Sequence, residues 1–339
     1  MTGPASGRRR VPSLRLAVLV PLLSLPLPAI AAGARIESTE VHEGLCDASG
    51  AVALPEGSFG ERFLMVNNDD NFVRVYAVGE PGANGGTPGL PLQAPEDMRK
   101  SFDIEAATWL DGEALFVGSL SRDDRGEAEP DRWHFLSVAV DETEGGGTVL
   151  HPGGSSARLL DGLARLDEDL AAAIGSAGDG DPDLAPGRAG INLEGMSVTA
   201  DGAALFLGFR NPVPAGRSLL VKLLNPRDVL FEDAEPAFAP PVRLDLGGLG
   251  IRSMEYSPAA GVYFIVAGPA GEGPGFDIYT WAEDGAPAPV PGARAALATL
   301  VGFAPEGLVI DQSGTRLQLF GANDDCETAT FRSVVMTLE

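Results

Sequence analysis

The sequence predicts an all-β chain folded as a β-propeller, most simply with five four-stranded blades. One unit of acidic residue, apolar run, turn and stronger apolar run repeats along the chain. The apolar runs are short, rich in Val, Leu and Phe, and separated by Gly, Asp and Pro, which is typical of strands rather than βαβ units. The last unit lacks a fourth strand, and an alternating segment near the N-terminus, residues 35–41, is able to supply it. Units of four strands in series form propeller blades.

The repeat places one acidic residue at the same point of each unit. Its copies are Asp103-Ile-Glu105 before Ala114–Gly118, Asn192-Leu-Glu194 before Ala204–Gly208, Ser253-Met-Glu255 before Val262–Val266, Ala304-Pro-Glu306 before Arg316–Phe320, and a degenerate Cys46-Asp47 before Arg62–Val66. A repeat of this length fixes the architecture and places the equivalent residue of each unit at the equivalent position of its blade.

The blades are expected roughly at 42–100, 101–190, 191–251, 252–303, and 304–339 completed by 35–41. Closing the last blade with the N-terminal strand removes exposed sheet edges. In the fourth unit we expect the outermost strand at Ala295–Val301. Six blades are the alternative, which would require a further blade in a segment interpreted here as loop.

One stretch departs from the repeat. Leu159, Leu163, Leu166, Leu170 and Ile174 recur at helical spacing, which predicts a helical insertion near residues 156–174 on one face of the propeller. It could serve as a lid over a site or as a decoration without a role in binding.

Residues 1–31 have the features of a secretory signal peptide. Three arginines, Arg8 to Arg10, precede the apolar stretch 14–30, which ends in Ala29-Ile-Ala31. We therefore expect a secreted or periplasmic protein in which residues 32–339 form a single propeller domain.

The charge of the chain limits its partners. The net charge of -24 includes four leader arginines, so removal of the leader makes it -28. Such a surface repels nucleic acid and anionic membranes. We expect a monomer whose partner is a small anionic ligand or an extracellular protein or glycan.

Two cysteines lie near the two ends of the mature chain, Cys46 and Cys326. An even pair in an oxidising compartment predicts a disulfide. In a closed ring the first and last units are neighbours, so the bridge would join them.

The repeated acids are the candidate functional residues, because the innermost strand of each blade lines the axis of a propeller. Asp47, Glu105, Glu194, Glu255 and Glu306 are expected to meet there. Like charges raise one another's pKa, so such a ring needs a hard cation, arginine partners or backbone N–H donors. Calcium suits oxygen ligands of this kind. The alternative is that each glutamate links its blade to the next through hydrogen bonds.

Arginines next to the ring suggest how an anionic group would be held. Arg122 and Arg210 follow the second strands of their units, and Arg252 precedes Glu255. A guanidinium pairs with carboxylate or phosphate in a two-pronged geometry. One hypothesis is a divalent-cation-dependent hydrolase of phosphate or other esters, with Glu105 and Glu194 as catalytic carboxylates and Arg122 or Arg210 on the substrate. The rival is a propeller without enzymatic activity that binds a protein or glycan on its rim.

Several motifs together resemble the bacterial "domain of unknown function 3616" family. They are Cys46-Asp-Ala-Ser49, Asp103-Ile-Glu105, Gly118-Ser-Leu-Ser-Arg122, Leu207-Gly-Phe-Arg-Asn-Pro212, Leu244-Asp-Leu-Gly-Gly-Leu-Gly-Ile-Arg-Ser253 and Pro305-Glu306-Gly307. The resemblance spans nearly the whole mature chain and implies a β-propeller with no assigned activity. Leu120 and Asp123 depart from the more polar loop that the resemblance leads us to expect.

Overall fold

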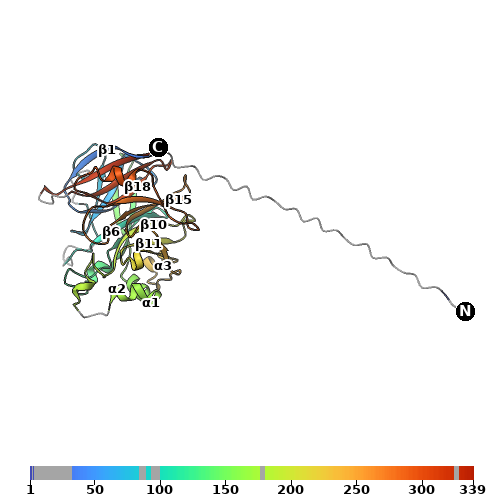
Figure 1. Ribbon diagram of the computed structural model, residues 1–339. Helices are drawn as coiled ribbons and strands as arrows, with labels where there is room; N and C mark the ends of the chain where they lie inside the picture. Colours follow the sequence, from blue (N-terminus) through green and yellow to red (C-terminus); the bar gives the residue numbers. More distant parts are fainter. Residues whose placement is uncertain (2, 4–32, 84–88, 93–99, 176–179, 324–327) are drawn as a thin grey trace.

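The computed structural model describes the chain except residues 2, 4–32, 84–88, 93–99, 176–179 and 324–327. Within the described residues, the strands form five four-stranded antiparallel sheets, arranged in a ring as a five-bladed β-propeller (Figure 1). The predicted fold is confirmed.

The blades follow one another along the chain. Blade I contains β2 (Ala48–Leu54), β3 (Arg62–Asn67), β4 (Phe72–Ala77) and β5 (Leu90–Pro91). Blade II contains β6 (Ile104–Leu110), β7 (Glu113–Gly118), β8 (Phe135–Glu142) and β9 (Thr148–Ser156). Blade III contains β10 (Asn192–Val198), β11 (Leu205–Asn211), β12 (Ser218–Leu223) and β13 (Val242–Leu244).

Blade IV contains β14 (Gly250–Ser257), β15 (Val262–Gly268), β16 (Asp277–Trp281) and β17 (Ala288–Pro289). Blade V contains β18 (Phe303–Ile310), β19 (Arg316–Asn323), β20 (Thr330–Leu338) and β1 (Ala34–Glu43). The N-terminal strand β1 pairs antiparallel with β20, so the two ends of the chain share one sheet (Figure 1). This is the predicted closure.

The innermost strands contact one another around the ring in the order β2, β6, β10, β14, β18 and back to β2. Each junction between neighbouring blades holds its own apolar cluster. Successive side chains of a strand point to opposite faces, so Leu205 and Leu207 face blade II while Phe206 faces blade IV. Burial on both faces explains why the strands read as continuous apolar runs.

The helical insertion is two helices rather than one. α1 (Leu159–Leu166) and α2 (Glu168–Ile174) are separated at Asp167, whose extended backbone and side chain cap α2 by accepting from the amides of Asp169 and Leu170. Leu163 and Leu170 are fully buried in the cluster between blades II and III. The insertion therefore extends the core at the edge of the propeller (Figure 1).

The predicted outer strand at Ala295–Val301 is wrong. That stretch instead contributes to α4 (Ala293–Leu297), and β17 is the outer strand of blade IV. Alanine favours helix, and α4 buries Ala293 and Leu297 between blades IV and V. A further short helix, α3 (Pro226–Phe231), follows β12. Across the described part of the chain, no helix has the length and apolarity needed to cross a membrane.

Candidate functional site

A β-bulge interrupts the innermost strand of every blade within its first half. The register between the first and second strands shifts by one residue at the same point of each blade. The residues at the shift are Ser49, Glu105, Glu194, Arg252 and Glu306. A bulged residue is left out of the ladder and its side chain is turned away from the sheet. The propeller thus presents one side chain per blade at a repeated position.

This register corrects two members of the predicted ring. In blade IV the repeated position is Arg252, and Glu255 lies three residues further along β14, paired with Phe264. In blade I it is Ser49 rather than Asp47. Only Glu105, Glu194 and Glu306 of the five predicted acids occupy bulge positions. The separation from the second strand gives no constant signal: Arg252 stands as far before Val262 as Glu306 does before Arg316, but Glu105 is closer to Glu113 and Glu194 further from Leu205.

Arg252 is buried and joins the acids of both neighbouring blades. Its Nε lies 2.8 Å from Oε2 of Glu194 in blade III, and its terminal nitrogen bonds Glu306 in blade V. Burial opposes the charge on Arg252, but the carboxylates of Glu194, Glu306 and Glu105 outweigh it and raise the pKa of the guanidinium. Arg252 therefore carries its positive charge among the glutamates.

A second arginine holds Glu194 from its own blade. Arg210 Nη1 donates to Glu194 Oε1 at 3.1 Å, and its other terminal nitrogen contacts Glu272 at 3.2 Å. The Asn192 amide donates to the same Glu194 oxygen at 3.0 Å. Glu194, which is only 1% exposed, is therefore held by two arginines and an amide.

Glu105 has none of these partners. Its side chain is buried, with 6% of the residue exposed, and the described residues provide it with no hydrogen bond or ion pair. Burial, and then the charges of Asp103, Glu194 and Glu306, raise the pKa of Glu105 well above its ordinary value. The Glu105 carboxyl is therefore harder to ionise than a glutamate in water.

Glu306 is intermediate between these two cases. Burial raises its pKa to about 7, against the opposing effect of the Arg252 charge. Glu105 and Glu306 thus both have pKa values above that of an exposed glutamate, and Glu306 is the one that exchanges its proton near neutral pH.

The ring opens into a cavity of about 750 Å³. Five acidic residues and three arginines of the described chain line it: Asp47, Glu105, Glu194, Glu272, Glu306, Arg210, Arg252 and Arg294. Two segments form its other walls, the loop 269–276 between β15 and β16 and the segment 297–303 that leads into β18. The cavity is acidic at one end and bounded by loop backbone and apolar side chains elsewhere.

Asp47 and Glu255 have separate environments. Asp47 lines the cavity, and burial followed by the charges of Asp69 and Glu272 raises its pKa. Glu255 is half-buried and does not line the cavity, and burial alone raises its pKa to about 8. No neighbouring charge contributes to that shift, which places Glu255 apart from the ring.

Arg122 does not reach the axial cavity. Its Nε donates to the carbonyl of Ile174 at 3.0 Å and Nη1 to that of Gly126 at 2.9 Å, so it ties the helical insertion to blade II. It lines a smaller cavity of about 220 Å³ beside α1 and α2. The predicted role of Arg122 next to the acid ring is therefore wrong, whereas Arg210 does line the axial cavity.

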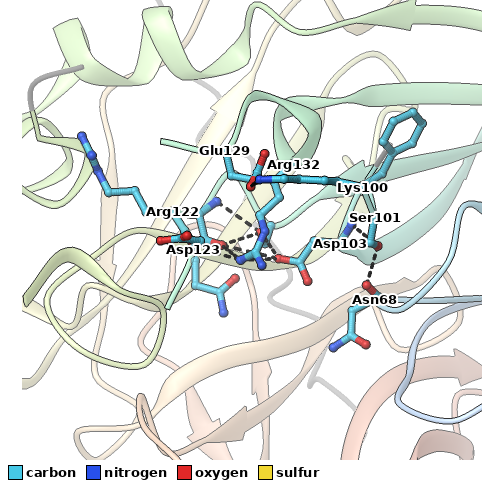
Figure 2. Close-up of polar contacts among 12 residues, drawn as sticks. Asn68, Lys100, Ser101, Asp103, Arg122, Asp123, Glu129 and Arg132 are labelled. Atoms are coloured by element: carbon cyan, nitrogen blue, oxygen red, sulfur yellow. Dashed lines mark hydrogen bonds and ion pairs between the residues drawn. The ribbon is translucent and has the colours of Figure 1, made fainter. Parts of the chain in front are cut away.

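A polar cluster next to Glu105 was not foreseen. Asp103 has φ of 51° and lies 3.2 Å from Arg132 Nη1, and Figure 2 shows these two side chains facing each other. Ser121 donates to the Asp103 carboxylate at 3.4 Å and accepts from Arg132 at 2.8 Å. Ser101 links this cluster to Asn68, which lines the axial cavity (Figure 2). Arg132 lies outside the repeat, so periodicity gave no signal for it.

The predicted metal ligands do not form a metal-binding group. Among the residues the structure describes, no three His, Cys, Asp or Glu side chains are grouped as ligands. Arg252 lies between Glu194 and Glu306 and satisfies both electrostatically. Arginine is thus one of the partners that compensate the negative charge of this ring of acids. Calcium binding stays a prediction.

Two further predictions involve residues outside the described chain. Cys326 lies there, so the bridge to the buried Cys46 stays a prediction. The leader, residues 1–31, lies there almost entirely, and secretion stays a prediction as well.

Comparison with known proteins assigns no family and no activity to the chain. No family model matches the chain, and no curated protein matches it. Among solved structures, it is similar to the β-propeller domain of Cps50 (Swd1) from Myceliophteria thermophila, with 12% identity and a TM-score of 0.37. That match covers 90% of this chain and 100% of the other. The chain is a five-bladed β-propeller, and its resemblance to the family of unknown function stays a prediction.

Proposed function

We propose that the axial cavity binds a positively charged ligand and that the Glu105 carboxylate forms an ion pair with it. The observation that supports this most directly is that Glu105 is buried, lines the cavity and has no partner among the described residues. A buried carboxyl without a partner is costly, and such exceptions cluster at functional sites.

The charge balance of the cavity favours a cation. Acidic side chains outnumber arginines by two among the lining residues, and Arg294 is already paired with Asp277 at 3.1 Å. An anion would have to compete with carboxylates for Arg210 and Arg252. The cavity therefore favours a cation over the small anionic ligand expected from the sequence.

In addition to the proposed binding role of the cavity, ion pairs between its residues join neighbouring blades. Arg252 joins blade IV to blades III and V, and Arg210 joins blade III to Glu272 of blade IV. Because these contacts hold Glu194 and Glu306 in place, Glu105 is the member of the ring left for a ligand.

Hydrolysis of a phosphate or other ester is the second candidate function. It is favoured by the raised pKa of Glu105, because a carboxyl with a raised pKa is better able to act as a general acid. Arg210 at the cavity wall would hold the anionic part of such a substrate. In this case water attacks the phosphorus or acyl carbon and the bond to the leaving oxygen breaks. Glu105 donates its proton to that oxygen while Glu194 keeps Arg210 oriented.

The test of binding is a melting curve of the mature protein with methylammonium, for wild type and Glu105→Gln. We expect methylammonium to raise the melting temperature of the wild type and to leave that of the variant unchanged. Glu272→Gln is the matched control, because Glu272 lines the same cavity but is exposed at its mouth. An equal rise in wild type and Glu105→Gln would contradict the proposed role of Glu105.

A screen of phosphate and carboxylate esters tests catalysis separately. We expect turnover to fall about 100-fold or more in Glu105→Gln, the loss typical of a missing general acid. Unchanged turnover in the variant would exclude Glu105 as that acid.

A further inference from the structure

The axial cavity is too large and too apolar at its mouth for an inorganic ion alone. Its volume is about 750 Å³, in the range of pockets that hold organic molecules. Three of its five acidic residues, Glu105, Glu194 and Glu306, lie at the bulges of the innermost strands, while Phe276 and the 297–303 segment supply apolar side chains. The cavity therefore combines acidic and apolar side chains.

The apolar wall is formed mainly by the 297–303 segment. Leu297 and Phe303 are buried and Leu300 is half-buried, all three within the cluster between blades IV and V. Val301 is 85% exposed although it lines the cavity. Since the Val301 carbonyl accepts from Arg332 at 2.8 Å, its backbone is held while its side chain stays in solvent.

The 269–276 loop adds an aromatic ring that packs against the same apolar cluster. Phe276, half-buried at the end of the 269–276 loop, lies with its ring centroid 5.8 Å from the Arg252 guanidinium carbon. The loop reaches this position through Gly273 and Gly275, whose φ angles of 129° and 117° are unfavourable for other residues. The Phe276 ring and the Glu105 carboxyl thus line the same cavity.

We propose that the natural ligand is an amphiphilic ammonium compound, whose charged head meets Glu105 and whose alkyl or aryl part lies along Phe276, Leu300 and Val301. This inference rests on the proposed function of the cavity and specifies its ligand class. Charge complementarity selects the head, because acids exceed arginines around the cavity. The exposed apolar side chain at the mouth selects the tail.

Binding of such a head changes the protonation of the site. In the empty site burial and neighbouring acids disfavour the ionised form of Glu105, and an ammonium group favours it. The head therefore displaces a proton, and affinity is expected to increase as pH rises toward the pKa of Glu105. The titratable groups facing Glu105 are Asp103, Glu194, Glu306 and Arg252.

The test is calorimetric titration of the mature protein with methyl-, ethyl-, butyl- and hexylammonium, and with hexanol and hexanoate as uncharged and anionic controls. We expect affinity to increase about two- to fourfold per methylene that enters the cavity, since each buried methylene contributes a transfer free energy of that size. Hexanol and hexanoate are expected to bind at least tenfold more weakly than hexylammonium. Titration in buffers of different ionisation enthalpy should show proton release with hexylammonium.

Two variants separate the head from the tail. Glu105→Gln should lower affinity for every ammonium compound by about tenfold or more. Leu300→Ser combined with Val301→Ser should leave methylammonium binding unchanged and abolish the gain with chain length. The tail substitutions lie at or near the surface, and a melting curve verifies that the fold is retained.

The outcomes discriminate between the two proposals. Equal affinity for methyl- and hexylammonium, both lost in Glu105→Gln, would overturn the amphiphilic ligand and retain the cation site. Hexanol or hexanoate binding as tightly as hexylammonium would overturn both, and so would the absence of any binding.

Discussion

Arg252 Nε lies 2.8 Å from Glu194 Oε2, and both residues occupy the β-bulge of the innermost strand in their own blades. The two bulges turn opposite charges toward each other across the junction of blades III and IV. Since Arg252 also bonds Glu306 of blade V, one guanidinium connects three blades. This pairing determines which acids of the ring remain available to a ligand.

Arg252→Met is expected to destabilise the protein by about 3–5 kcal/mol at neutral pH, because it leaves Glu194 and Glu306 buried without their shared cation. Chemical denaturation of the mature protein measures the change. The matched control is Arg227→Ala, whose pair with Asp111 is half-exposed and which should cost less than about 1 kcal/mol. A similar loss of unfolding free energy in both variants would show that the buried ion pairs contribute no more to stability than the exposed one.

Glu255→Gln is expected to stabilise the protein, by roughly 1–3 kcal/mol near pH 8. Burial raises the pKa of Glu255 to about 8, whereas in the unfolded chain it has the ordinary value of 4.5. The folded state therefore holds a proton that the unfolded state releases, and this cost grows as pH rises from about 4.5 to about 8.

Denaturation of wild type and Glu255→Gln at pH 5 and pH 8 measures that cost. The two proteins should differ little at pH 5, where the glutamate is protonated in the folded state, and most at pH 8. A constant difference between the two pH values would show that Glu255 does not titrate as its burial indicates.

Calcium is expected to leave the melting temperature of the wild type unchanged and to raise that of Arg252→Met. In the wild type the guanidinium occupies the position between Glu194 and Glu306 that a divalent ion would need. Its removal leaves neighbouring carboxylates that suit a hard cation. Melting curves with calcium and with chelator measure both effects, with Glu105→Gln alongside. A calcium-dependent rise in the wild type that disappears in Glu105→Gln would instead establish the calcium site predicted from the sequence.

Reduction is expected to lower the melting temperature if Cys46 and Cys326 form the predicted bridge. The bridge would close the first and last blades, and restricting so long a segment stabilises a protein by about 2–5 kcal/mol. Melting curves with and without reductant, for wild type and Cys46→Ser, measure the effect. A wild type insensitive to reductant would contradict a stabilising bridge.

The sequence by itself determined the number of blades and the closure of the ring. Strand runs such as Val262–Gly268 are short, apolar and bounded by turns, so their number and order are local properties of the chain. The match of β1 to β20 followed from a missing strand, because an unpaired sheet edge is unfavourable. Glu105, Glu194 and Glu306 were also found from the repeat alone.

Only the tertiary structure decided what those acids do. Arg252 rather than Glu255 belongs to the ring because a one-residue bulge shifts the register, and spacing from an acidic motif does not reveal where the bulge falls. Arg122 bonds the helical insertion because the Ile174 carbonyl at the end of α2, 52 residues away along the chain, approaches its guanidinium. Glu105 remains without a partner because Arg252 and Arg210 are taken by its neighbours. Which carboxylate is paired and which is left open depends on contacts between blades, and such contacts are set by packing rather than by local sequence.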